Sequence, residues 1–90
     1  MLTVGDRNHS YGDPSINLGT IAELKRVFWG AMTRSGKDAV QNSAFGTAID
    51  GVLTNLGRIA SSPSSYLARD RYVDGAAYLA IAYECGMNEA

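Results

Sequence analysis

The sequence predicts an all-α fold with three main helices in one compact domain. In three segments, apolar residues recur every three or four positions, which is the spacing of one face of a helix. No stretch of useful length alternates apolar and polar residues as a half-buried strand does. A chain of 90 residues with 46% hydrophobic and 19% charged residues is a single globular domain rather than a disordered segment.

The first predicted helix spans 15–33 and follows an N-terminal loop over 1–14. Asp13 is a favoured N-cap because its carboxylate accepts hydrogen bonds from free backbone N–H groups, and Pro14 suits the first helical position. The apolar residues that define the helix are Ile21, Leu24, Phe28 and Ala31. The pattern breaks at the Ser-Gly-Lys-Asp segment 35–38.

The second predicted helix spans 38–60, with Ser43 as an alternative first residue. One face is apolar and contains Phe45, Ala48, Ile49, Val52, Leu53, Leu56, Ile59 and Ala60. Gly51 and Gly57 each cost about 1 kcal/mol relative to Ala inside a helix. Two such glycines indicate that a neighbouring helix or a ligand approaches this helix closely.

The third predicted helix spans 70–85, after a serine-rich turn over 61–65, and Gly86 is expected to end it. Two sides of this helix differ in character. One side carries Tyr72, Ala76, Leu79 and Tyr83, and another carries Asp70, Asp74, Ala77, Tyr78 and Ile81. Because the helix is rich in Ala and Gly, we expect tight packing within the chain or across the interface of a homo-oligomer.

Charge and cysteine content limit the classes of function. The net charge is −1 and the basic residues are scattered, which excludes a duplex nucleic acid partner but allows a small anionic ligand. The single cysteine, Cys85, offers neither a disulfide nor a zinc cluster and suits a reducing compartment. No apolar run reaches the length of a signal peptide or membrane span, so we expect a cytoplasmic protein with no membrane partner.

The segment 5–17 gathers charged, amide, hydroxyl and aromatic groups around two glycines, directly before the first helix. Arg7 suits a phosphate and Tyr11 suits a nucleobase, and free N–H groups at the helix start favour an anion. The alternative is structural, with Asp13 as a cap and Gly12 as a turn residue. The candidate ligand-binding residues in this segment are Asp6, Arg7, Asn8, Tyr11, Gly12 and Asn17.

Further candidates lie on the second and third helices. Asp70 and Asp74 share a helix face and could hold Mg²⁺ with a polyphosphate, although Asp70 also suits an N-cap. Tyr78 follows Asp74 on the same face, which makes this pair the better candidate for ligand binding. Arg58 either reaches a ligand phosphate, with Arg69 or Arg71 as possible additions, or is a solvated cation near a helix C-terminus. The only histidine, His9, cannot form a multi-histidine metal site.

Three motifs together resemble a family of small phage-encoded domains of unknown function. They are GDRNHSYGDPSIN, a helix ending in Arg-Ile-Ala, and Asp-x-x-Val-Asp-x-x-x-Tyr, and the resemblance covers nearly the whole chain. Asn55 departs from the pattern, because relatives often have Lys at this position. The resemblance points to Gly5, Asp6, Arg7, Asn8, Tyr11, Gly12, Asp13, Pro14, Asn17, Arg58, Asp70, Asp74 and Tyr78.

These domains are in turn similar to the MazG-like all-α nucleoside triphosphate pyrophosphohydrolases, which hold Mg²⁺ with several Glu residues on two helices. Here the second helix carries one carboxylate, Asp50, so the alternative metal set is Asp50, Asp70 and Asp74. Two-metal hydrolysis needs several convergent carboxylates. We therefore expect the pocket of such a domain without its metal chemistry.

The leading hypothesis is a phage protein, in the cytoplasm of an infected bacterium, that binds a nucleotide or nucleotide-derived signal without turnover. A cyclic signal fits this description, and sequestering it would counter host defence. No cofactor is expected. One alternative is a MazG-like, Mg²⁺-dependent pyrophosphohydrolase, and another is a protein-binding inhibitor or small structural phage protein. The residues assigned to ligand binding are Asp6, Arg7, Asn8, Tyr11, Gly12, Asn17, Arg58, Asp70, Asp74 and Tyr78.

Overall fold

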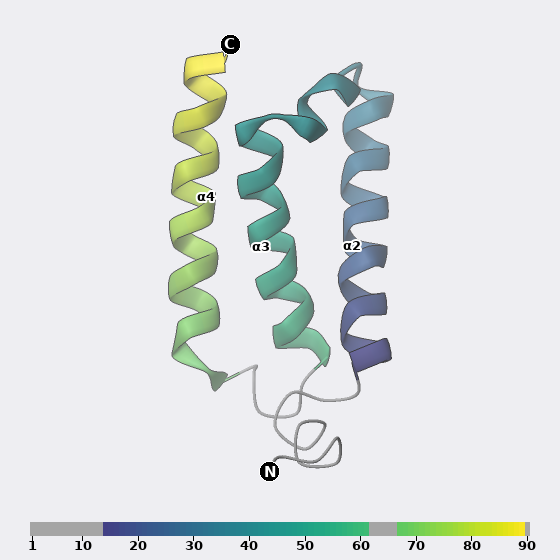
Figure 1. Cartoon of the computed structure of the whole chain (residues 1–90), viewed down its shortest axis with the longest axis vertical. Helices are drawn as coiled ribbons and strands as arrows, with labels where there is room; N and C mark the ends of the chain where they lie inside the picture. The colour runs from purple at the N-terminus through teal and green to yellow at the C-terminus, as the bar shows by residue number, and fades with distance from the viewer. Residues whose placement is uncertain (1–13, 62–66, 90) are drawn as a thin grey trace.

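The computed structural model describes residues 14–61 and 67–89, and this part of the chain is helical with no strand. The three long helices that the sequence predicts are present, and they lie side by side with α3 in the middle (Figure 1). Helices α2 and α4 both pack on α3 and run antiparallel to it. The elements in chain order are α2 (Pro14–Arg34), the 3-10 helix η1 (Asp38–Asn42), α3 (Ala44–Ser61) and α4 (Arg69–Glu89).

Helix α2 begins at Pro14 and ends at Arg34, within one residue of the predicted bounds at each end. The chain then turns at Gly36, whose φ of 78° lies in the left-handed region that glycine adopts without strain. Two backbone bonds accompany this turn, from the N–H of Gly36 to the carbonyl of Thr33 (2.9 Å) and from that of Lys37 to Met32 (2.8 Å). They satisfy carbonyl groups that the end of a helix otherwise leaves unpaired.

The predicted helix 38–60 is divided in two. The segment Asp38–Asn42 forms η1, and α3 starts only after Ser43, whose backbone is extended. The Ser43 hydroxyl accepts a hydrogen bond from the Gly46 N–H at 3.2 Å, which is the contact of an N-cap. Ser43, the alternative start in the sequence, therefore caps the α-helix, and the chain before it forms a tighter turn.

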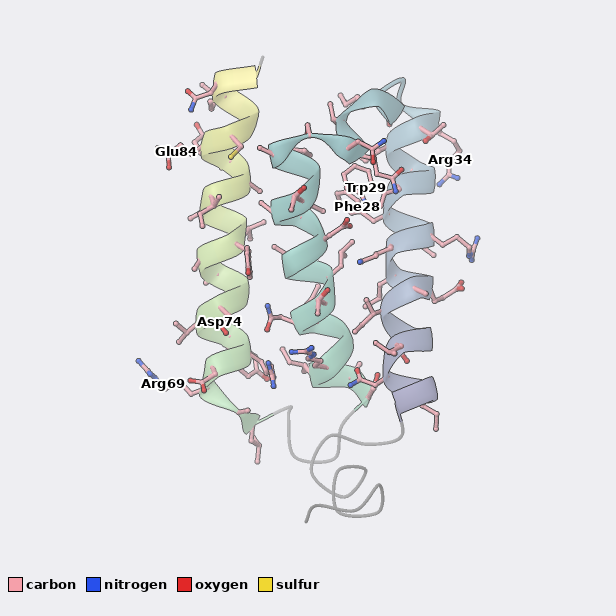
Figure 2. All side chains as sticks on the ribbon, in the orientation of Figure 1. Phe28, Trp29, Arg34, Arg69, Asp74 and Glu84 are labelled. Carbon is pink, nitrogen blue, oxygen red and sulfur yellow. The ribbon has the colours of Figure 1, made fainter. Side chains whose placement is uncertain are left out.

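The core lies between α2, α3 and α4 and is small. The indole of Trp29 is buried, meets the ring of Phe28 edge-on at 5.0 Å (Figure 2), and donates from Nε1 to Asp50 Oδ1 at 2.9 Å. This bond anchors α2 to α3 through a polar contact beside the apolar cluster. The cluster consists of Trp29, Ala48, Ile49, Leu53 and Ala82, with Leu24, Phe28, Met32, Val40 and Phe45 packed against it.

Both glycines inside α3 allow close approach by neighbouring helices. A Cβ at Gly57 would overlap the side chain of Ile21 on α2, and a Cβ at Gly51 would lie 2.8 Å from the ring of Tyr78 on α4. The close approach that the sequence predicts at these positions is therefore confirmed, and in both cases the neighbour is a helix of the same chain.

Helix α4 extends beyond its predicted end. The expectation that Gly86 ends the helix is wrong, because α4 continues to Glu89. Gly86 lies inside it, where an added Cβ would be 3.3 Å from the ring of Phe45. The missing side chain at this position thus serves packing on α3 rather than helix termination. No helix in the described ranges combines the length and apolar character needed to cross a membrane.

Candidate functional site

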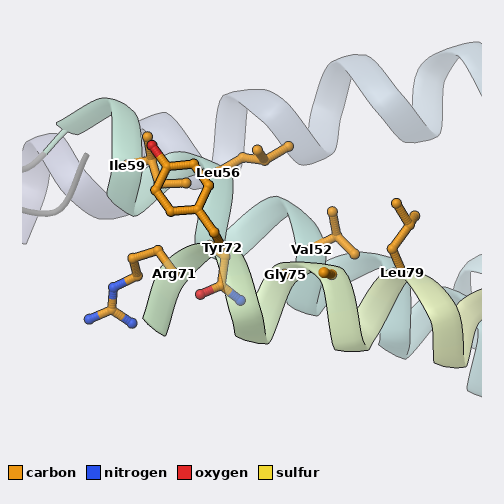
Figure 3. Close-up of a pocket in the computed structure, with 9 residues that line it drawn as sticks. Val52, Leu56, Ile59, Arg71, Tyr72, Gly75 and Leu79 are labelled. Carbon is orange, nitrogen blue, oxygen red and sulfur yellow. The ribbon is translucent and has the colours of Figure 1, made fainter. Parts of the chain in front are cut away.

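A groove with a volume of about 190 Å³ lies between α3 and the first half of α4 (Figure 3). Its walls are mainly apolar, and three polar side chains interrupt them. The lining residues are Val52, Asn55, Leu56 and Ile59 from α3, and Arg71, Tyr72, Gly75, Ala76 and Leu79 from α4. Gly75 faces Asn55 across the two helices, and a Cβ added at Gly75 would lie 3.7 Å from Asn55 Cβ.

The polar groups of the groove lie near the start of α4. The ring of Tyr72 extends toward Ile59 and Leu56, whereas the guanidinium of Arg71 extends away from these apolar side chains (Figure 3). The Nε atom of Arg71 is buried and has no hydrogen-bond partner. Asn55 is only 6% exposed, and its amide nitrogen donates to the Gly51 carbonyl of its own helix at 2.9 Å.

Most of the arginines considered for phosphate binding lie at one end of the bundle. The start of α2, the end of α3 and the start of α4 meet there, as the Gly57–Ile21 contact and the chain directions show (Figure 1). Asn17 lies in this part of α2, and its Oδ1 is the other buried side-chain atom of the described residues without a hydrogen-bond partner. The arginines that the helix ends bring here are Arg58, Arg69 and Arg71.

The structure places Tyr78 away from the groove. Its ring lies on Gly51, and helical spacing puts Asp74 and Asp70 on the same flank of α4. Arg58 lies two turns beyond Gly51 on the same side of α3. Arg58, Asp74 and Tyr78 therefore share one face of the helix layer, and the groove opens on the other. Both aspartates are exposed, and no ion pair joins either of them to Arg58.

The alternative metal ligands do not come together. Asp50 accepts the hydrogen bond of Trp29 on the α2 side of α3, whereas Asp70 and Asp74 are exposed on α4. Within 14–61 and 67–89, no group of three His, Cys, Asp or Glu side chains is placed to hold a metal ion.

Five of the predicted ligand residues lie outside the described residues. They are Asp6, Arg7, Asn8, Tyr11 and Gly12. The groove instead contains two polar residues, Tyr72 and Asn55, that were not among the predicted ligand residues. The sequence does contain a signal for Tyr72. It shares one side of the helix with Ala76 and Leu79, and all three line the groove.

The one ion pair among the described residues lies on α2, between Glu23 and Arg26. Its hydrogen bond and charge attraction hold the pKa of Glu23 below its usual value and raise the pKa of Arg26. Both side chains are exposed, so solvent screens the pair and its contribution to stability is small. It takes no part in the groove.

Comparison with known proteins finds no matching family model, no matching curated protein and no matching solved structure.

Proposed function

We propose that this protein binds a nucleotide or nucleotide-derived anion without turnover, with one ring in the groove and a phosphate on Arg71. The observation that carries this proposal is the buried, unpartnered Nε of Arg71 at the end of an apolar groove that also contains Tyr72. A guanidinium pairs with phosphate through fixed, parallel donors, and an aromatic ring stacks on a nucleobase.

The dimensions and charge of the site support this assignment. A volume of about 190 Å³ is below the roughly 300–1,000 Å³ of a typical small-molecule pocket, so the groove takes one ring system rather than a whole nucleotide. The phosphate then lies outside, at the end of the bundle where Arg69 and Arg71 begin α4. The N-terminus of α4 adds a partial positive charge there.

Binding without hydrolysis is supported by the position of Asp50. Its carboxylate is engaged by Trp29 and faces α2, so it is not directed at the groove or at the aspartates of α4. Because the sequence resembles small phage domains, we extend the proposal to a biological role. The protein would sequester a nucleotide signal of host defence, a cyclic one included, in the cytoplasm of an infected bacterium.

We also propose that the protein is a homo-oligomer. Exposed large apolar side chains are concentrated on α4, whose one buried side chain among the described residues is Ala82. Uncovered apolar surface of this extent marks an interaction site. Tyr72, Leu79 and Tyr83 share one side of α4, with Met87 near its end, and this side is the proposed interface. Val73, Tyr78 and Ile81 are exposed on other sides of the helix.

A thermal-shift screen of mononucleotides, dinucleotides and cyclic oligonucleotides tests the binding proposal. A ligand at a hundred times its dissociation constant stabilises the fold by about 2.7 kcal/mol, which corresponds to a shift of several degrees for a small domain. Arg71→Gln is expected to weaken binding about 10- to 100-fold, since it removes a charge-assisted hydrogen bond of about 1.5–3 kcal/mol. Arg34→Gln is the matched control, because Arg34 lies at the end of the bundle far from Arg69 and the start of α4 (Figure 2). This variant is expected to keep wild-type affinity.

The screen is run with and without Mg²⁺, followed by chromatography of the mixture. Recovery of unchanged ligand is expected in both arms, whereas conversion in the Mg²⁺ arm would establish the hydrolase instead. No shift with any nucleotide would refute both the nucleotide binder and the hydrolase, and it would leave the protein-binding alternative. Loss of binding in Arg58→Gln with Arg71→Gln unaffected would move the site to the opposite face.

A further inference from the structure

A stripe of uncharged side chains runs along α4 beside the groove. Tyr72, Ala76, Leu79 and Tyr83 follow one another at spacings of four, three and four, which keeps them on one side of the helix. Tyr72 is 52% exposed, Leu79 55% and Tyr83 72%, and Ala76 is also exposed. Met87, which is 62% exposed, extends the apolar surface toward the end of the helix.

We propose that a second copy of this chain covers the stripe through an antiparallel α4–α4 pairing, and that the two copies complete each other's groove. The spacing of four, three and four reads the same from either end of the helix. Antiparallel alignment about the middle of the stripe therefore sets Tyr72 against the partner's Tyr83, and Ala76 against the partner's Leu79. A large side chain then meets a small one at the centre, as knobs-into-holes packing requires.

The charges beside the stripe favour the same arrangement. Arg69 and Glu84 project from the same outer side of α4 near its opposite ends (Figure 2). In an antiparallel pair, Arg69 comes beside the partner's Glu84, and symmetry forms this contact twice. A parallel pair would leave Arg69 and Glu84 at opposite ends of the interface and would align the two helix dipoles unfavourably.

The exposed area fits a reversible dimer. Large aromatic side chains bury about 150–250 Å² each, so the exposed parts of Tyr72, Leu79, Tyr83 and Met87 amount to about 400–500 Å² per copy. The two copies together bury about 800–1,000 Å², which is the size of a weak, reversible interface. Because the core of a single chain is small, the interface adds a substantial share of its buried apolar surface.

The pairing also adds a wall to the proposed site. Tyr72 lines the groove, so the partner's Tyr83, packed against Tyr72, lies at the groove's open side. This part of the inference rests on the proposed function, because it assigns a residue of the second copy to the nucleotide site. A groove that takes only one ring in a single copy thus becomes more enclosed in the dimer.

Sedimentation of the ligand-free protein over a wide concentration range tests the pairing independently of nucleotide. The wild-type protein is expected to be a dimer, and Tyr83→Glu is expected to raise the dimer dissociation constant about 30-fold or more. Ile81→Glu is the matched control, since Ile81 is an exposed apolar residue of the same helix outside the stripe. It should remain dimeric, and circular dichroism checks that both variants keep their helices.

Charge reversal tests the direction of the pairing. Arg69→Glu and Glu84→Arg are each expected to weaken the dimer several-fold, and the double variant is expected to restore it. A monomeric wild-type protein, equal damage from Ile81→Glu and Tyr83→Glu, or no rescue in the double variant would overturn the antiparallel pairing. Nucleotide binding by a monomer would overturn the pairing and the homo-oligomer but leave the nucleotide site standing. A dimer that binds no nucleotide would overturn the nucleotide site alone.

Discussion

Replacing Trp29 by Ala is expected to lower the free energy of unfolding by about 3–5 kcal/mol. Trp29 is the largest buried side chain of the cluster that joins α2 to α3, and it is 5% exposed. Its removal leaves a cavity and also leaves Asp50 without the indole donor. Since domains are stable by only about 5–15 kcal/mol, this loss approaches the whole stability of a small one.

Trp29→Phe separates packing from hydrogen bonding. It keeps an aromatic ring at the contact with Phe28 but removes the Nε1 donor, and we expect a loss of about 1–3 kcal/mol. Urea unfolding monitored by far-ultraviolet circular dichroism measures both variants on the same scale. A loss below about 1 kcal/mol for Trp29→Ala would contradict the position of this residue in the core.

Replacing Gly46 by Ala is expected to destabilise the fold by about 1–3 kcal/mol or more. An added Cβ would overlap the carbonyl oxygens of Val40 and Gln41. These are backbone atoms of the corner between η1 and α3, so they cannot move aside as a flexible side chain does. The substitution therefore forces the first turn of α3 away from η1.

Gly19→Ala provides the control with the opposite sign. Gly19 is exposed in α2 with no atom near the position of an added Cβ, so Ala is expected to stabilise the helix by up to about 1 kcal/mol. The melting temperatures of the two variants should move in opposite directions from that of the wild type. A neutral or stabilising Gly46→Ala would show that the corner is not packed as described.

Hydrophobic spacing is sufficient to predict the all-α fold and the extent of α2. The segment 38–60 shows where spacing fails, because the division at Ser43 depends on a local cap and on the contact of Gly46 with η1. Gly86 shows a second failure. Glycine favours a helix C-terminus, but here the close approach of Phe45 from another element explains its presence. Contacts between elements decide both cases, and a single sequence does not display them.

The candidate site was predictable only in part. Arg71 was a possible phosphate ligand in the sequence, and the structure places it at the groove. The sequence favoured Tyr78 over Tyr72 as a ligand residue, whereas Tyr72 is the tyrosine that lines the groove. The choice depends on the position of α3, which puts Gly51 under Tyr78 and opens the groove beside Tyr72. Five of the N-terminal candidates lie outside the described residues and stay predictions.

An NMR titration tests most directly whether the groove at Arg71 binds an anion with a ring. The labelled protein is titrated separately with adenosine monophosphate, a cyclic dinucleotide and inorganic phosphate. With a nucleotide, the side-chain resonances of Arg71 Nε and the Asn55 amide are expected to shift to saturation, together with the backbone amides of Tyr72 and Gly75. Phosphate alone should shift Arg71 and leave Asn55 unchanged. Saturable shifts confined to the face of Arg58 and Tyr78, or no shift with any of the three, would contradict the proposed site.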